Sequence, residues 1–253
     1  MITTYHRPKT MEEALALLTQ PNTLPLGGGT LLSKPTTDPL TGAVSVAVVD
    51  LQALGLDSLR VNGNELQIGA TCTLQSLLEA DSCPAALKTA LKLEAPLNIR
   101  NTATVAGTLV ASDGRSTFAA MLLAMDAKIE IRSSILESRT ANIGEFILAR
   151  PSGLVTSITI PLNVKTAFEF VSKTPADKPI VCASLAQWNS RRTRLTLGGY
   201  GKSPLLAMDG TEADGLETAA RNAYHEANDE WASAEYRMDV AATLSKRALE
   251  SIK

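Results

Sequence analysis

The chain has 253 residues, of which 45% are hydrophobic and 20% are charged, and its formal net charge at pH 7 is -2. These values are typical of soluble globular proteins with room for more than one core, and the small negative charge argues against nucleic acid as a partner. No stretch approaches 18 uninterrupted apolar residues and the N-terminus carries no apolar signal run, so we expect a cytoplasmic protein without a membrane span.

The first part of the chain predicts a small α/β unit. Thr10 followed by Glu13 is a capping-box pattern, and apolar residues on one face continue it as a helix that ends before Pro21. The next segment, TLPL, is a short strand that enters a run of three glycines. The segment AVSVAVVDL at 43–51 is rich in β-branched residues, which is typical of a buried strand.

The same order of elements begins again further along the chain. A strand in ELQIG breaks at Gly69, and a helix in TLQSLLEA follows. We then expect a helix near 84–94, a turn at PLNIRN, a Thr/Val/Gly-rich segment TATVAGTLVASDGRS, a helix in FAAMLLAMDA, and strands at KIEIRS and LVTSITIPL. From about residue 164 the pattern changes to three strands, AFEFVS, IVCASLAQW and RLTLGG, followed by helices near 212–227 and 230–251, which predicts a separate α+β domain.

Several residues of types that often carry chemistry are predicted to be structural. The cysteines have no CxxC spacing and no histidine nearby, so we expect no metal or iron–sulfur site within this chain. Asp50 ends a predicted strand, and no dinucleotide fingerprint precedes it, so we favour a strand-end acid over a ribose-binding one. The residues expected in the core, at a domain interface or in a helix cap or bridge are Cys72, Cys182, Trp188, Trp231, Glu235 and Arg237.

The segment PLGGGTLL at 25–32 requires a specific backbone, because three successive glycines are costly unless a turn or a close approach needs them. Consecutive glycine amides can form a concavity suited to an anion such as a phosphate. The alternative is a tight turn where two backbones touch. Neither the Walker GK[ST] pattern nor the GxGxxG spacing follows, so the two common phosphate-binding folds are disfavoured.

A second small turn makes a phosphate site more plausible than the glycines alone. The segment TATVAGTLVASDGRS contains the small pair Ala106-Gly107, a hydroxyl at Thr108, and a polar turn at Ser112 and Asp113. Two such turns, each contributing backbone N–H groups and a threonine hydroxyl, would suit a diphosphate without lysines. Their apolar flanks would leave room for flat rings.

In order and spacing, PLGGGTLL, LQIGATCTLQSLL and NIRNTATVAGTLVASD resemble the signature segments of the FAD-binding medium subunit of the molybdenum hydroxylases, the carbon monoxide dehydrogenase and xanthine dehydrogenase group. The likeness continues through LVTSITIP and RLTLGG to ASAEYRMDVAATLSKRALE, which is essentially the whole chain. It implies an α+β fold: two FAD-binding subdomains of the vanillyl-alcohol-oxidase/PCMH type, followed by a C-terminal domain with a three-stranded antiparallel sheet and helices. The implied limits are 1–55, 56–163 and 164–253.

The resemblance also implies roles for individual residues in binding FAD. One phosphate would be held by the first loop, the other by the second turn, and the ring or ribityl chain would be lined by apolar side chains. The first loop is Leu26, Gly27, Gly28, Gly29 and Thr30, and the second turn is Thr104, Ala106, Gly107 and Thr108. The apolar lining would be Leu31, Leu32, Leu154 and Val155. Ser112 and Asp113 would lie near the sugar or ribityl hydroxyls, and Lys173 is the nearest basic residue.

Four positions depart from the family pattern, and one of them is near Thr117, where the family commonly has an acidic residue beyond the second turn. Ala106 stands where the family usually has the first glycine of a Gly-Gly pair, and Leu31 stands where a polar residue is common. Glu169 lies in the strand that often carries a basic residue near the flavin's pyrimidine end.

The leading hypothesis is an electron-transfer flavoprotein subunit. The resemblance implies that a large partner carries the molybdopterin cofactor, a small partner carries iron–sulfur clusters, and FAD on this chain passes electrons to an external acceptor. We assign no catalytic acid or base, because the redox chemistry belongs to the cofactor. The alternatives are a free-standing FAD oxidoreductase of the same fold and a degenerate scaffold subunit that has lost FAD.

Overall fold

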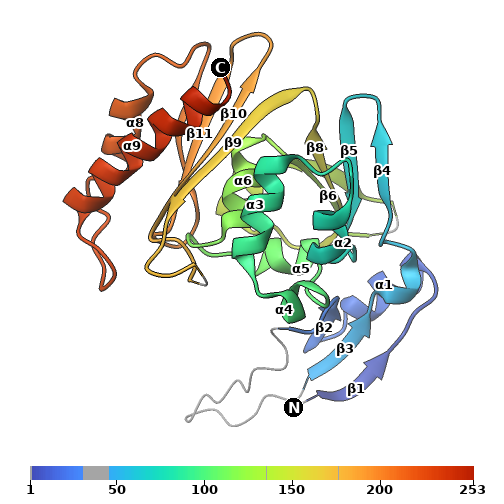
Figure 1. The fold of residues 1–253 in the computed structure, drawn as a ribbon. Coiled ribbons are helices and arrows are strands. Elements are labelled where there is room, and N and C mark those ends of the chain that lie inside the picture. The colour runs from blue at the N-terminus through green and yellow to red at the C-terminus, as the bar shows by residue number, and fades with distance from the viewer. Residues whose placement is uncertain (1, 31–45, 135, 176) are drawn as a thin grey trace.

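The computed structural model describes residues 2–30, 46–134, 136–175 and 177–253, which form three sheets in chain order (Figure 1). The first sheet is parallel, with the strand order β1-β3-β2. The predicted helix is confirmed, because the Thr10 hydroxyl oxygen accepts the Glu13 amide at 3.2 Å and caps its first turn. The elements are β1 (Ile2–His6), α1 (Met11–Leu18), β2 (Thr23–Leu26), β3 (Val46–Asp50) and the short 3-10 helix η1 (Gln52–Leu54).

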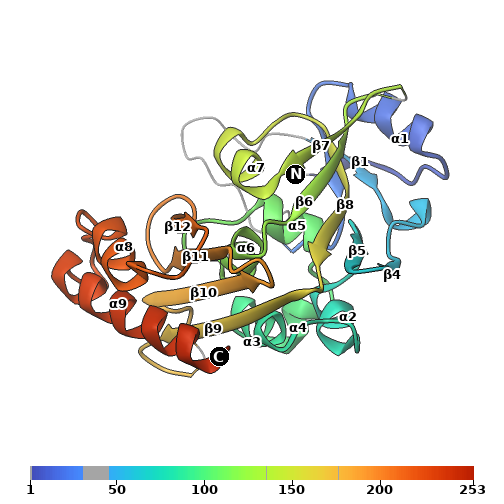
Figure 2. The same cartoon turned by 90° about the horizontal axis from the view of Figure 1, so that it is seen from above.

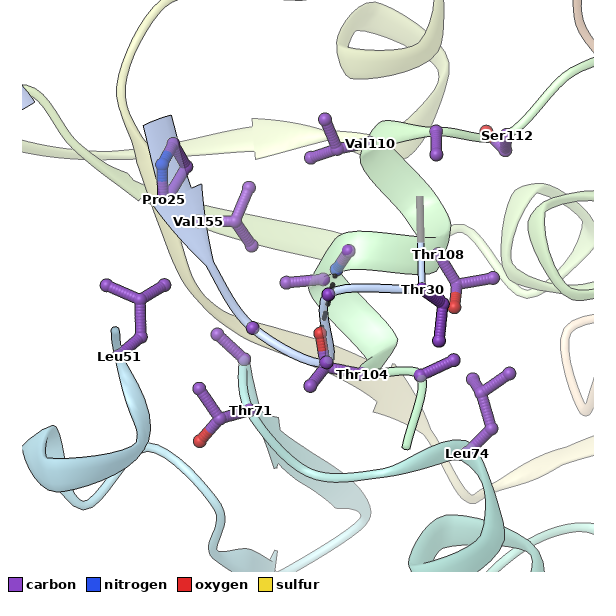
Figure 3. Close-up of a pocket in the computed structure, with 18 of the residues that line it drawn as sticks. Pro25, Thr30, Leu51, Thr71, Leu74, Thr104, Thr108, Val110, Ser112 and Val155 are labelled. Atoms are coloured by element: carbon purple, nitrogen blue, oxygen red, sulfur yellow. Dashed lines mark hydrogen bonds between the residues drawn. The ribbon is translucent and has the colours of Figure 1, made fainter. Parts of the chain in front are cut away.

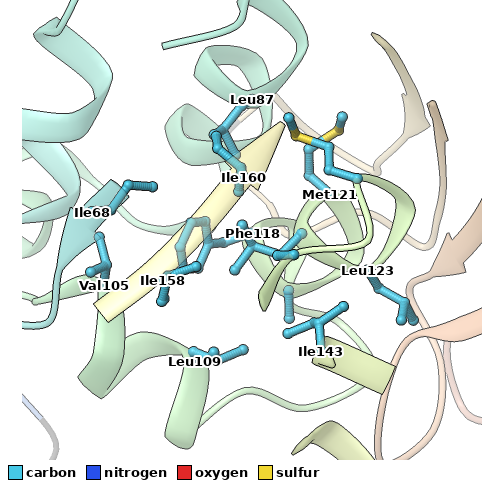
Figure 4. Packing of buried hydrophobic residues seen from close by; sticks show 14 of the residues in the cluster. Ile68, Leu87, Val105, Leu109, Phe118, Met121, Leu123, Ile143, Ile158 and Ile160 are labelled. Carbon is cyan, nitrogen blue, oxygen red and sulfur yellow. The ribbon is translucent and has the colours of Figure 1, made fainter. Parts of the chain in front are cut away.

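The second sheet has five antiparallel strands in the order β4-β5-β8-β6-β7. Its buried face packs against helix α6, all eight residues of which are buried, and the shared apolar cluster includes Ile68, Phe118 and Ile158 (Figure 4). Burying each such side chain contributes about 1.5–3 kcal/mol, so this cluster is a major source of stability. The elements are β4 (Leu59–Asn62), β5 (Glu65–Gly69), α2 (Leu74–Glu79), α3 (Ala85–Glu94), α4 (Leu97–Arg100), α5 (Val105–Val110), α6 (Thr117–Ala124), β6 (Lys128–Arg132), β7 (Ser138–Asn142), α7 (Ile143–Ala149) and β8 (Leu154–Pro161).

The third sheet is antiparallel with the order β12-β11-β10-β9. Helices α8 and α9 cover one face, and α6 contacts β10 and β11 from the other, so the third sheet lies between them (Figures 1 and 2). The elements are β9 (Val164–Val171), β10 (Val181–Trp188), β11 (Thr193–Gly198), β12 (Leu205–Gly210), α8 (Leu216–Ala223) and α9 (Ala234–Ser251). No helix in these described ranges is both long and apolar enough to cross a membrane.

The structure corrects three of the predicted elements. The C-terminal sheet has four strands rather than three, because LLAMDG forms β12 beside β11. The predicted turn PLNIRN contains the short helix α4, and the Thr/Val/Gly-rich segment contains helix α5. Thr104 begins α5 by accepting the Gly107 amide at 3.2 Å, so a local cap offsets the poor helix propensity of the glycine and β-branched residues that follow.

Asp50 and Trp231 lie as predicted. Asp50 is 3% exposed at the end of β3, where it accepts the Gln52 amide at 2.9 Å and the Tyr5 hydroxyl, so it is a strand-end acid. Trp231 is 40% exposed and lies against Arg115 of the segment between α5 and α6, whose guanidinium carbon is 4.5 Å from its ring centroid, so it makes a contact between the predicted second and third domains.

The three cysteines are buried, which confirms Cys72 and Cys182 as core residues and predicts low thiol reactivity. Burial raises the thiol pKa to about 11 for Cys72 and to about 12 for Cys83 and Cys182. All three thiols are therefore protonated at neutral pH. We expect no labelling by a thiol-specific disulfide reagent in the native protein and three equivalents after unfolding in guanidinium. Rapid native labelling would contradict the buried placement.

Candidate functional site

A cavity of about 470 Å³ lies between the first sheet and the second (Figure 3). Three stretches of chain that are distant in sequence meet there: the glycine loop after β2, the turn after β5, and helix α5 with the segment after it. The described residues that line it are Leu24, Pro25, Gly27, Gly28, Gly29, Thr30, Leu51, Ala70, Thr71, Leu74, Glu94, Ala95, Ile99, Ala103, Thr104, Ala106, Gly107, Thr108, Val110, Ala111, Ser112, Asp113, Gly153, Leu154, Val155 and Lys178.

The glycine loop touches the backbone that leads into α5. A Cβ on Gly28 would lie 1.9 Å from the Thr102 carbonyl oxygen, and a Cβ on Gly27 would lie 2.7 Å from Thr104 Oγ1. Gly29 has a φ of +67°, a left-handed backbone that side chains rarely adopt. The interpretation of the glycine run as a turn where two backbones touch is therefore confirmed, and the same loop lines the cavity.

Backbone amides of the two loops differ in whether they are already hydrogen-bonded. Within the described part of the chain, the amides of residues 27–29 have no hydrogen-bond acceptor. Those of residues 105–108 all have one, namely Cys72 O, Ala70 O, Thr104 Oγ1 and Thr104 O in turn. The expectation that both loops offer backbone donors is therefore wrong for the second, whose amides are used to hold α5 in place.

Thr71 is a site residue that the sequence analysis missed. It is 8% exposed, lines the cavity, and its Oγ1 is buried without a hydrogen-bond partner among the described residues. A buried hydroxyl left unpaired costs about 1–3 kcal/mol. Only the fold reveals it, because GATCT carries no motif that distinguishes this threonine from its neighbours.

Glu94 and Lys178 form the charged part of the lining. Glu94 is 9% exposed and accepts Ser116 Oγ at 2.9 Å, the Phe118 amide at 3.0 Å and Lys178 Nζ at 3.1 Å. Among the described lining residues Lys178 is the one cation. Lys173, the basic residue expected at the site, lies outside the lining, with its Nζ 4.6 Å from the centroid of the Trp231 ring.

Most of the predicted site residues lie together. Leu26 ends β2 outside the lining, and Leu31 and Leu32 fall outside the described residues. The predicted residues that line the cavity are Gly27, Gly28, Gly29, Thr30, Thr104, Ala106, Gly107, Thr108, Ser112, Asp113, Leu154 and Val155.

Two of the family departures have a structural account. The Ala106 amide bonds to Ala70 O at 3.2 Å while the residue lines the cavity, so the fold accommodates its methyl group. Glu169 pairs with Ala183, which belongs to the apolar cluster on the α8 and α9 side of the third sheet, and Glu169 does not line the cavity.

The cavity fits a ligand with an anionic middle and flat apolar ends. Within the described residues the unpaired amides of 27–29 offer donors, Gly27 and Gly28 leave no room for a Cβ, and Leu24, Leu51 and Val155 provide apolar walls. A dinucleotide with a diphosphate has this distribution of charge. No group of three or more His, Cys, Asp or Glu side chains in the described ranges could hold a metal ion.

Comparisons with known proteins agree with this geometry. A family described as the FAD binding domain in molybdopterin dehydrogenase matches residues 1–163. The carbon monoxide dehydrogenase medium chain of Afipia carboxidovorans is 29% identical over 279 residues, covering 98% of this chain and 96% of that one. The protein YgfM of Escherichia coli K12 is 29% identical over 252 residues, covering 96% and 94%.

Solved structures of the same kind share the fold. A Cu,Mo-CO dehydrogenase in its cyanide-inactivated form matches with a TM-score of 0.83 and 25% identity, covering 100% of this chain and 98% of that one. A reconstituted CO dehydrogenase from Oligotropha carboxidovorans matches with a TM-score of 0.82 and 26% identity, covering 98% and 96%. Quinoline 2-oxidoreductase from Pseudomonas putida 86 matches with a TM-score of 0.80 and 18% identity over 98% of this chain and 96% of that one, a likeness of fold alone.

Proposed function

Since the chain belongs to the family of FAD-binding domains of molybdopterin dehydrogenases, we propose that it is the electron-transfer subunit of a molybdenum hydroxylase complex and holds its FAD in the cavity described above. The observation that carries the proposal is that the amides of residues 27–29, which line a cavity together with Thr104 and Thr108, have no acceptor among the described residues. Amide donors directed at an oxyanion make charge-assisted hydrogen bonds, which are roughly twice as strong as neutral ones.

The residues divide by what they would do for the cofactor. The first loop would donate its amides to the diphosphate, and the hydroxyl of Thr108 would add a donor beside it. Leu24, Leu51 and Val155 would exclude water from the apolar ends. When bound, FAD supplies the redox chemistry, and this chain's part is to bind and orient it.

Thr104 allows a test of a single residue's proposed contact with FAD. Thr104→Val removes the hydroxyl that caps α5 and lines the cavity, so we expect FAD binding to weaken by at least tenfold, with about 1 kcal/mol lost in unfolding free energy. Thr10→Val is the matched control, because Thr10 caps α1 through the same 3.2 Å bond and does not line the cavity. Equal FAD affinities in the two variants would contradict the proposed role of Thr104.

FAD binding itself is tested with the purified chain. We expect non-covalent binding at micromolar concentration, read from the flavin absorption spectrum and fluorescence quenching, because no histidine or cysteine lines the cavity in the described ranges to form a covalent link. Acid precipitation should release the flavin into the supernatant. An intact chain that binds no FAD at tens of micromolar would favour the scaffold alternative.

The likeness to a medium chain supports a partnership with a large molybdopterin subunit and a small iron–sulfur subunit. The rim of the cavity is suited to a partner, since Leu24, Ile99 and Val110 line it and are still between 37% and 55% exposed.

Co-purification from the native host tests the partnership. We expect one larger and one smaller chain to accompany this one and the complex to absorb as iron–sulfur plus flavin, with no hydroxylase turnover by the isolated chain. A protein that runs alone and oxidises a substrate would favour the free-standing oxidoreductase. The described lining offers that alternative little support, because the buried carboxylate of Glu94 is already bonded to four donors.

A further inference from the structure

Arg150 has a backbone that arginine rarely adopts. It ends helix α7 with φ 44° and ψ 57°, the left-handed conformation usually taken there by glycine or asparagine. Its amide bonds to Phe146 O at 3.0 Å and closes the helix, which glycine could also do. A left-handed backbone costs a residue with a Cβ about 1–2 kcal/mol, which contacts made by its side chain can offset.

The Arg150 side chain reaches the far end of α5, which is a wall of the cavity. Its Nη1 donates to Leu109 O at 2.9 Å and to Val110 O at 2.8 Å, and its Nη2 donates to Ser112 O at 2.6 Å. A further contact of 3.3 Å joins Nη2 to Ser112 Oγ. Val110 and Ser112 line the cavity (Figure 3). One guanidinium therefore fixes both the end of α5 and the polar segment that follows it.

The charge of Arg150 is not neutralised by a carboxylate within 4.0 Å in the described ranges. Arg100 and Arg115 likewise have no carboxylate within 4.0 Å in the described ranges. Arg100 donates to Ala95 O and Arg115 donates to Lys178 O, and both acceptors belong to lining residues. Lys178, the cation within the lining, is paired with Glu94. The unneutralised positive charge around the cavity therefore lies behind its walls, on guanidiniums bound to wall carbonyls.

We infer that Arg150 is a positioning residue for the dinucleotide: it holds the wall at 109–112 in place and its unneutralised charge attracts the diphosphate. The inference rests on the proposed FAD site. Charge held behind a wall acts over several ångströms without competing for the cavity's space, and its effect weakens as salt screens it. This accounts for how a cavity with one paired lysine in its described lining would bind a dianionic diphosphate.

The left-handed backbone allows an unusually clean test. Arg150→Gly removes the side chain and leaves a residue that suits φ 44°, so the fold should be retained. We expect FAD to bind about tenfold more weakly, because several charged hydrogen bonds to the wall are lost. The matched control is Arg191→Gly in the turn between β10 and β11, where Arg191 has a φ of 71° and pairs with Glu212 at 3.4 Å. Its FAD affinity should equal that of the wild type.

Two further measurements separate position from charge. The dependence of the FAD dissociation constant on sodium chloride should be shallower for Arg150→Gly than for wild type, a change that a purely structural role would not produce. Arg150→Lys keeps the charge without the fork of donors, so it should restore the salt dependence and only part of the affinity.

Three outcomes would overturn the inference. The first is wild-type FAD affinity in Arg150→Gly, and the second is an equal loss of FAD affinity in Arg150→Gly and Arg191→Gly. The third is a salt dependence of the FAD dissociation constant that is the same in Arg150→Gly as in the wild type. Failure of the proposed function is distinguishable, because the wild-type chain would then bind no FAD in the same titration.

Discussion

Gly28→Val is expected to abolish FAD binding while the C-terminal part of the chain remains folded. The first side-chain carbon at this position would lie 1.9 Å from the Thr102 carbonyl oxygen and 2.6 Å from its carbon. Both are backbone atoms, so no side-chain rotation relieves the clash, and the glycine loop must move away from the backbone that leads into α5. The amides of residues 27–29 would then no longer lie beside Thr104, and the cavity would lose its donors.

The measurement combines FAD titration with tryptophan fluorescence. Both tryptophans, Trp188 and Trp231, follow β9 in the chain, so their emission reports on the third sheet and its helices rather than on the glycine loop. Gly144→Ala is the control: its added carbon would meet Leu123 Cδ1 at 3.7 Å, an ordinary contact, and alanine favours the helix. Unchanged FAD affinity in Gly28→Val would mean that the loop does not bind the cofactor.

Arg237→Met is expected to cost about 3–5 kcal/mol of unfolding free energy, because it leaves a carboxylate and several carbonyls without their donor. Arg237 has no exposed surface. Its guanidinium donates to both Asp229 oxygens at 2.8 and 2.9 Å, to Ala227 O at 2.6 Å and to Ala232 O at 2.9 Å. Since small domains have about 5–15 kcal/mol in total, this single change should bring the third sheet and its helices close to unfolding.

Urea denaturation followed by tryptophan fluorescence measures the loss. Arg221→Met is the matched control, because Arg221 on α8 pairs with Asp239 on α9 but both side chains are about half exposed, and such pairs contribute about 0–1 kcal/mol. A similar loss in the two variants would contradict the central role assigned to Arg237.

Low pH should also lower the free energy of unfolding, because it protonates Asp229 and weakens its interaction with Arg237. Burial alone would raise the pKa of the Asp229 carboxyl, but hydrogen bonds from Arg237 and from the amides of Trp231 and Ala232 outweigh it and hold that pKa below its ordinary value. A carboxyl with a lowered pKa adds stability above its ordinary pKa and loses it as the pH falls through the lowered value. The wild type should therefore lose stability below about pH 4, and Arg237→Met should show a smaller pH dependence.

Local rules account for the parts of the fold that were predicted correctly. The capping box at Thr10, the β-branched run before Asp50 and the apolar helix after Thr117 depend on neighbours within one or two turns of chain, so their residues suffice to predict them. Helix α5 and strand β12 were missed because their stability comes from elsewhere: α5 is held by its cap and by carbonyls of Ala70 and Cys72, and β12 by pairing with β11.

By itself, the sequence determined the family, the two loops and twelve of the 26 described residues that line the cavity, because glycine runs, small residues and threonine caps report directly on local backbone demands. Only the tertiary structure decided which residues, distant in the chain, these local elements contact. It places Gly28 against Thr102, pairs Lys178 with Glu94 and carries the Arg150 guanidinium to the end of α5, and it leaves the Thr71 hydroxyl without a partner among the described residues. Each of these contacts joins residues distant in the chain, so its energy depends on the packing of whole sheets rather than on any local pattern.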